Sequence, residues 1–165
     1  MAEILRKTFE RAVKLLAAKP RSVAELRERL LRGKNVNEEV VETVISRLRE
    51  YGYLNDERFA FGYASYKVKQ KPVGRRRLER DLKLKKVESS VANEALEMVY
   101  AETSEEQLIE EAIAKRLRIR GKPKNRAEAK SLFDHLLRRG FDFELVSEKI
   151  RSLTTDDTDE VNSNG

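Results

Sequence analysis

The sequence lacks cysteine and tryptophan, and its 165 residues include only three prolines, seven glycines and one histidine. Without cysteine there is no disulfide framework, no thiolate nucleophile and no cysteine-based zinc site. The scarcity of proline and glycine argues against a loop-rich or all-β protein. No apolar run is long enough to span a membrane, and the first residues do not form a signal peptide. We therefore expect a cytoplasmic protein with no membrane contact.

Charged residues are abundant, at 39% of the chain, with 35 Lys and Arg against 29 Asp and Glu. Glu, Lys, Arg, Leu and Ala dominate the composition, and these residues favour helices. A formal net charge of +6 is modest, so the distribution of charge along the chain matters more than its sum.

Apolar residues recur with a period of about fifty residues. The pair Leu26 and Leu30 returns as Leu78 and Leu82, and again as Leu132 and Leu136. Downstream positions keep step with these pairs: Val36, Val40 and Leu48; Val87, Val91 and Val99; Phe141, Leu145 and Leu153. Such repetition predicts stacked supersecondary units that share a core.

Helical periodicity and capping residues predict three helices in each copy. Ser22 with Glu25, Ser104 with Gln107 and Asn125 with Glu128 have the spacing of capping boxes. Glycines 33, 52, 121 and 140 fall where helices should end. The predicted helices are Glu3–Ala18, Val23–Arg32, Glu38–Tyr51, Asp56–Lys69, Gly74–Lys85, Ser90–Tyr100, Glu105–Arg120, Arg126–Arg139 and Phe143–Ser152.

The predicted fold class is all-α, with three tandem three-helix modules in an elongated row that can be curved. The module boundaries are residues 1–54, 55–102 and 103–153. Residues 154–165 contain four acids and no Lys or Arg, so we expect a disordered acidic tail there.

Positive charge is concentrated in two segments. Residues 67–86 contain ten cations and two acids, and residues 115–126 contain seven cations and no acid. If Leu78 and Leu82 face the core, then Arg76, Arg80 and Lys83 form an outward row at helical spacing, flanked by Arg75 and Arg77. The second segment supplies Arg116, Arg120, Lys122 and Lys124. Both clusters predict contact with a polyanion such as the DNA phosphate backbone.

Signals for other chemistry are weak. The sequence has no glycine-rich nucleotide-binding loop. His135 is the sole histidine and has no sequence neighbours that form a triad or a metal site, so a surface position on a helix is expected for it. Pairs of acids lie in first helical turns, where they favour the helix dipole. We predict no catalytic residue, no cofactor and no metal.

The segment from Gly52 to Phe59, Gly-Tyr-Leu-Asn-Asp-x-x-Phe, joins a helix stop to a helix start through a short hydrophobic clasp. Together with the Ser22-x-x-Glu25-Leu26-x-x-x-Leu30 pattern, it resembles the RecX family of bacterial regulatory proteins. The likeness covers about residues 9–153. Where the family usually carries Lys-Gly, this chain has Lys85-Lys86. If the left-handed turn is kept, Lys86 adopts it at a cost of about 1 kcal/mol.

The resemblance implies three tandem three-helix modules and a protein that is not an enzyme. It implies binding to RecA recombinase and to the RecA–single-stranded DNA filament. The implied effect is inhibition of filament growth, ATP hydrolysis, strand exchange and coprotease activity, as part of DNA repair and the SOS response. We expect the protein to act as a monomer.

Two other functions are compatible with the residues alone. A helix-turn-helix DNA-binding regulator could use a helix pair of each module, although the third helices, Glu38–Tyr51 and Ser90–Tyr100, are acidic or apolar and poorly suited to reading bases. A helical adaptor without a nucleic-acid role would use its basic clusters only for solubility.

Overall fold

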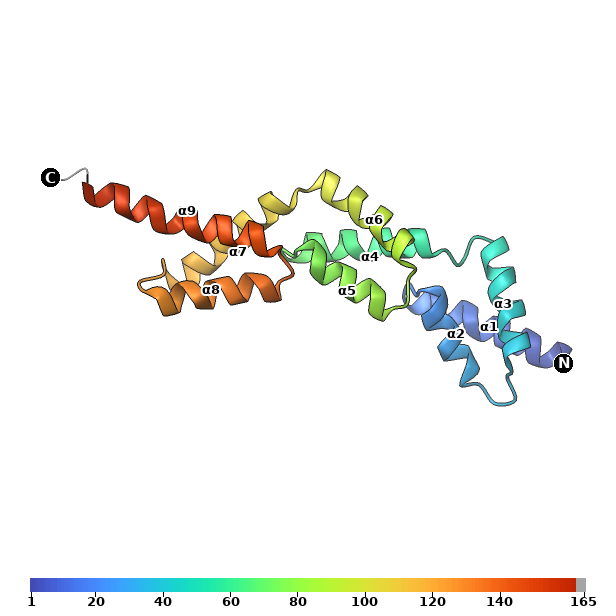
Figure 1. The fold of residues 1–165 in the computed structure, drawn as a ribbon. Helices are drawn as coiled ribbons and strands as arrows, with labels where there is room; N and C mark the ends of the chain where they lie inside the picture. Colours follow the sequence, from blue (N-terminus) through green and yellow to red (C-terminus); the bar gives the residue numbers. More distant parts are fainter. Residues whose placement is uncertain (163–165) are drawn as a thin grey trace. The chain divides into compact units, whose positions relative to one another are not determined.

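The computed structural model describes the backbone of residues 1–162 and the side chains of residues 1–154. This part of the chain contains helices and no strand, so the predicted all-α class is confirmed (Figure 1). The helices are α1 (Ala2–Ala18), α2 (Val23–Leu31), α3 (Glu38–Glu50), α4 (Asp56–Gln70), α5 (Arg75–Leu84), α6 (Ser89–Glu102), α7 (Glu105–Arg120), α8 (Arg126–Arg138) and α9 (Phe143–Asn162).

Helix α9 is longer than the sequence predicts. The expected disordered tail begins at residue 154, whereas the backbone continues as helix to Asn162. Residues 163–165, the rest of that predicted tail, lie outside the described residues.

The chain divides into two compact units. The first comprises Met1–Ala64 and Asp81–Glu97, and the second comprises Ser65–Arg80 and Met98–Gly165. The division passes through α4, α5 and α6, so the first unit contains all of α1–α3 and the second all of α7–α9. The three module boundaries predicted from sequence remain predictions.

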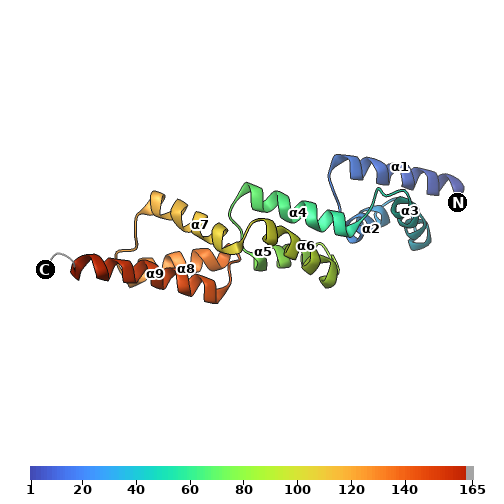
Figure 2. The ribbon, with the colours of Figure 1, turned by 90° about the horizontal axis from the view of Figure 1, so that it is seen from above.

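In the first unit, α1, α2 and α3 contact one another around an aliphatic core (Figure 2). The predicted pair Leu26 and Leu30 is completely buried there. Each leucine of this kind contributes roughly 1.5–3 kcal/mol to stability through burial.

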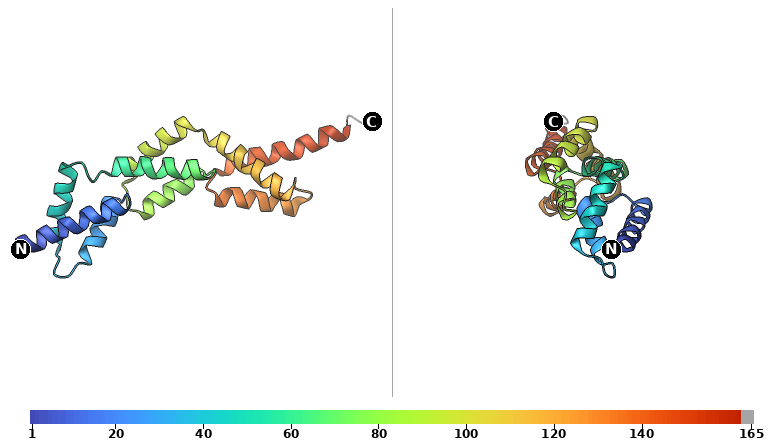
Figure 3. Two further views of the ribbon diagram at one scale, coloured as in Figure 1. Left: turned by 180° about the vertical axis from the view of Figure 1, so that it is seen from behind. Right: turned by 90° about the vertical axis from the view of Figure 1, so that its right-hand side faces the viewer.

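In the second unit, α8 contacts both α7 and α9 (Figure 3). Leu136 and Phe141 are almost fully buried. Helix α9 also contacts α7: Lys149 Nζ lies 2.9 Å from Glu106 Oε1 and 2.8 Å from Glu110 Oε1. These two carboxylates raise the pKa of Lys149 and tie α9 to α7.

In two of the third helices, the buried position is one residue later than the sequence repeat predicts. Val40 is buried, but its predicted counterparts Val91 and Leu145 are only half-buried. Their neighbours, Ala92 and Val146, take the buried positions. The third helices therefore present a slightly rotated face to the core.

Helix starts follow the predicted caps. Ser22 and Glu25 form the complete capping box. Ser104 and Asn125 each accept a hydrogen bond from the backbone N–H three residues on, at 3.1 and 2.9 Å. Each cap satisfies an N–H that has no partner inside its helix.

Helices α2, α3, α7 and α8 end next to the predicted glycines, but the left-handed turn after α2 lies at another residue. Gly33 does not carry the left-handed turn after α2; Asn35 does, with φ of 61°. The same position has φ of 56° at Lys86 and 91° at Gly140. Asparagine tolerates this region better than most residues. The expectation that Lys86 adopts the left-handed turn is confirmed.

The start of α2 contacts the residues that follow α5. The buried Ser22 hydroxyl donates to the Lys85 carbonyl at 2.7 Å. The Val23 N–H donates at 2.8 Å to the carboxylate of Asp56, the first residue of α4. Lys85 Nζ also lies 3.4 Å from Glu25 Oε2. These contacts partner first-turn groups that a helix cannot satisfy by itself.

The start of α5 contacts the residues that follow α8 in the same manner. The Gly74 N–H donates to the Arg139 carbonyl at 2.9 Å, and the Arg76 N–H donates to the Gly140 carbonyl at 3.1 Å. A Cβ on Gly74 would lie 2.2 Å from the Gly140 carbonyl carbon. Such close backbone approach requires glycine.

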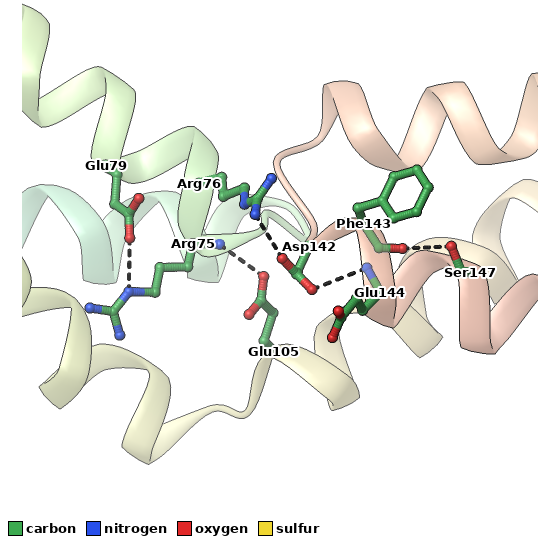
Figure 4. Close-up of polar contacts among 8 residues, drawn as sticks. All are labelled: Arg75, Arg76, Glu79, Glu105, Asp142, Phe143, Glu144 and Ser147. Atoms are coloured by element: carbon green, nitrogen blue, oxygen red, sulfur yellow. Dashed lines mark hydrogen bonds and ion pairs between the residues drawn. The ribbon is translucent and has the colours of Figure 1, made fainter.

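A carboxylate at the start of a helix completes each set of contacts. Glu105, the first residue of α7, accepts from the Arg75 N–H at 3.2 Å (Figure 4), as Asp56 accepts from Val23. Burial raises the pKa of Glu105, and the Arg75 N–H opposes that rise. We call these sets the first joint (Ser22, Val23, Asp56, Lys85) and the second joint (Gly74, Arg75, Arg76, Glu105, Arg139, Gly140).

Alanine substitutions at Gly74, in the second joint, and at Gly62, outside it, should change stability in opposite directions. Gly74→Ala should lower the free energy of unfolding by about 1–3 kcal/mol, because the new methyl group overlaps backbone that cannot move aside freely. Gly62→Ala, in α4 with open space around it, should raise that free energy by about 0.5–1 kcal/mol. Urea unfolding followed by circular dichroism measures both. A Gly74→Ala variant as stable as the parent would contradict the close approach.

Candidate functional site

The first basic cluster lies on α5. Leu78 and Leu82 are fully buried, and Arg76, Arg80 and Lys83 are exposed, so the predicted inward and outward positions are confirmed. We call these three cations the α5 ridge. Arg76 and Arg80 belong to the second unit, and Lys83 belongs to the first.

The cations at the start of α5 have partners within the protein (Figure 4). Arg75 Nε lies 3.0 Å from Glu79 Oε1, one turn further along the helix. Arg76 Nη2 lies 3.0 Å from Asp142 Oδ1, which also accepts through Oδ2 from the Glu144 N–H and caps α9.

Arg77 belongs to the packing of the second joint. A Cβ on Gly140 would lie 2.5 Å from the Arg77 backbone nitrogen. Burial lowers the pKa of Arg139, and the nearby charge of Arg77 lowers it further.

Arg80 and Lys83 differ from these residues. Within the described side chains, neither forms an ion pair. They are therefore the members of the α5 ridge best placed to meet an external anion.

The second predicted group is only partly assembled. Arg116 and Arg120 line one hollow of about 320 Å³ between α7 and α8, together with Leu117, Pro123, Glu128 and Leu132. Lys122 and Lys124 are exposed in the loop that follows. The Lys124 N–H donates to Glu128 Oε2 at 2.7 Å, which links the loop to the first turn of α8.

A second hollow of about 190 Å³ contains cations that sequence reasoning missed. Arg116 also lines this hollow, and the other lining residues are Lys71, Pro72, Ala112, Lys115, Ile119, His135 and Arg139. We call it the His135 hollow. No local sequence pattern predicts this hollow, because its residues come from three separate segments.

His135 is half-buried rather than a simple surface residue. Burial is the main cause that lowers the pKa of His135, and the charges of four cations lower it further: Arg116, Arg138, Arg139 and Arg120. Because the folded protein disfavours the imidazolium, His135 is mainly neutral near pH 7.

Arg139 is fixed by the backbone. Its Nε and Nη2 groups donate to the Pro72 carbonyl at 3.1 and 2.6 Å. Burial and the charge of Arg77 lower the pKa of Arg139. Its guanidinium is therefore already ordered at the edge of the second joint. An ordered side chain loses less conformational entropy on binding a ligand than a flexible one does.

The described side chains offer no cluster of three His, Asp or Glu that could hold a metal ion. Among residues 1–162, no helix combines the length and apolar character needed to cross a bilayer.

These features define an all-α protein of repeated three-helix sets with exposed basic side chains. Residues 9–48 match the family described as RecX, first three-helix domain, and residues 55–96 match RecX, second three-helix domain. A regulatory protein RecX from Prosthecochloris aestuarii is 31% identical over 150 residues, which cover 91% of this chain and 95% of that protein. The chain therefore belongs to the RecX family of regulatory proteins.

Other relatives are longer. A regulatory protein RecX from Oceanobacillus iheyensis is 27% identical over 95% of this chain, and the chain spans 57% of that protein.

The crystal structure of RecX from Lactobacillus salivarius has the same fold, with a TM-score of 0.81, 19% identity, and coverage of 94% of this chain and 99% of that one.

His135 should make stability depend on pH in a defined direction. Its pKa is lowered on folding, so the unfolded chain binds the proton more tightly, and folding loses stability as pH falls through about 6.5 and below. His135→Gln removes this contribution. The variant should lose less free energy of unfolding than the parent between pH 7.5 and pH 5, as measured by urea unfolding at both values. An equal loss in the two proteins would contradict the position of His135 among these arginines.

Proposed function

We propose that this protein binds RecA and its filament on single-stranded DNA and inhibits RecA activities. The inhibited activities are filament growth, ATP hydrolysis, strand exchange and the coprotease function. Membership of the RecX family is the observation that carries the proposal, since the matched relatives are named regulatory proteins. The RecA filament combines a protein surface with a polyanion, and this chain presents exposed cations on a helical scaffold.

The physical logic is multivalent contact. A repeated scaffold can meet several subunits of a regular filament, and each additional contact forms at a high effective concentration. Contacts to DNA phosphates would add affinity without base recognition, because phosphates carry no sequence information. Such binding weakens steeply as salt concentration rises.

Within the α5 ridge, Arg80 and Lys83 are the leading candidates for phosphate contact. Both are exposed and have no ion-pair partner among the described side chains. Arg76 ranks behind them because Asp142 already offsets its charge. The second group, Arg116, Arg120, Lys122 and Lys124, is proposed to reach the same polyanion from α7 and the following loop.

Charge reversal of the ridge tests the proposal. Arg80→Glu with Lys83→Glu should leave the helix content and the free energy of unfolding unchanged. The concentration of this variant needed to inhibit the RecA ATPase on single-stranded DNA by half should be at least about ten times that of the parent. Two lost phosphate contacts produce a loss of that size at moderate salt. Arg76 stays unchanged so that its pair with Asp142 in the second unit is preserved.

The matched control reverses two exposed cations outside the basic segments, Lys14→Glu with Arg29→Glu. Its inhibition should equal that of the parent. Full inhibition by the ridge variant would remove the α5 ridge from the mechanism. Absence of any inhibition by the parent, combined with tight binding to one duplex sequence, would favour the helix-turn-helix alternative.

A further inference from the structure

None of the α5 ridge cations lines the His135 hollow, and the lining of this hollow is unusual. Four cations line it (Lys71, Lys115, Arg116 and Arg139), together with His135, and no acidic side chain lines it. The nearby Asp134 carboxylate lies 3.0 Å from Lys130 Nζ, so its charge is already matched. Positive potential concentrated in a hollow attracts anions more strongly than scattered surface cations do.

Part of this lining is preorganised. The Arg139 guanidinium donates two hydrogen bonds to the Pro72 carbonyl, while its own carbonyl accepts from the Gly74 N–H. Arginine has five N–H donors, so others remain for an incoming oxygen. A ligand would meet a side chain that is already ordered, which lowers the entropic cost of binding.

His135 reports the electrostatic environment. Besides burial, the groups that lower its pKa are all cations, from α7 (Arg116, Arg120) and from α8 (Arg138, Arg139). Lys71 and Lys115 line the same hollow. An anion bound here would offset these charges and favour the protonated imidazole.

The apolar part of the lining restricts the chemistry of the anion. Ile119 is 69% exposed at the hollow, beside Pro72 and Ala112. A small inorganic ion would leave this apolar surface uncovered, whereas the sugar or base of a nucleotide could cover it.

The neighbouring hollow extends the same surface. Arg116 lines both hollows, and Arg120 lines the neighbouring hollow of about 320 Å³ but not the His135 hollow. Two adjacent basic hollows that share one arginine fit a polymer with regularly spaced charges better than a single ion.

We propose that the His135 hollow is a phosphodiester-binding subsite for single-stranded nucleic acid. Lys115, Arg116 and Arg139 would contact phosphate oxygens, and Ile119 with Pro72 would contact the attached sugar or base. The subsite deepens the proposed function and rests on the nucleic-acid part of it.

The sole histidine of the chain provides a direct probe. The imidazole resonances of the intact protein would be titrated by NMR without ligand, with an oligothymidylate of about 12 nucleotides, with inorganic phosphate and with polyglutamate. We expect the oligothymidylate to raise the pKa of His135 and to shift its resonances at concentrations where the other two anions do not. A response to inorganic phosphate alone, or to polyglutamate more strongly than to the oligonucleotide, would overturn the proposal.

Paired variants test the lining. Lys115→Gln with Arg116→Gln should reduce the salt dependence of oligothymidylate binding by about 1.4 in the slope of log K against log salt, since each single-strand phosphate contact contributes about 0.7. Arg118→Gln, an exposed cation on the same helix that lines neither hollow, should change the slope far less. Equal slopes for the double variant and the control would overturn the subsite.

The two proposals fail separately. If the parent protein inhibits the RecA ATPase but the oligothymidylate leaves the His135 resonances unchanged, the subsite is wrong and the proposed function stands. If the oligonucleotide shifts His135 but the RecA ATPase is unaffected, the subsite stands and the proposed RecA inhibition is wrong.

Discussion

Helix N-termini that receive their hydrogen-bond partners from a later helix are the constraint on which this structure depends. The first N–H groups of a helix have no acceptor within it. At the start of α2, the Asp56 carboxylate of α4 accepts from a backbone N–H, and the carbonyl of Lys85, which follows α5, accepts from the Ser22 hydroxyl. At the start of α5, the Glu105 carboxylate of α7 and the carbonyls of the residues that follow α8 accept from backbone N–H groups. The two joints use positions related by the sequence repeat. In each joint the carbonyl end of one helix meets the N–H end of another, so the helix dipoles attract.

The joints also decide which cations are available for binding. Arg75 and Arg76 begin α5 and are engaged by Glu79 and Asp142, so their charge supports the fold as much as it attracts a ligand. One turn further along α5, Arg80 forms no ion pair with any described side chain. The second joint likewise orders Arg139 beside Pro72 and thereby contributes to the His135 hollow. The residues of the second joint therefore contribute both to the fold and to the candidate binding surface.

The sequence predicts the helices well because the signals for them are local. The leucine pairs, the Ser22 cap and the outward direction of Arg80 follow from helical spacing within a few residues. The failures concern relations between distant segments or single positions in turns. The pairing of Arg76 with Asp142 and the gathering of Lys71, Arg116 and His135 leave no pattern at short spacing. Gly33 lies where α2 ends, but an extra residue in that loop places the left-handed turn at Asn35.

Amide hydrogen exchange at the second joint tests the central claim most directly. In a helix whose start is open to water, the amides of Gly74 and Arg76 would exchange quickly, because no acceptor protects them. The structure predicts that both exchange slowly, with protection comparable to that of amides in the middle of α5, since each donates to a carbonyl after α8. Fast exchange at Gly74 and Arg76, with α5 itself protected, would contradict the account.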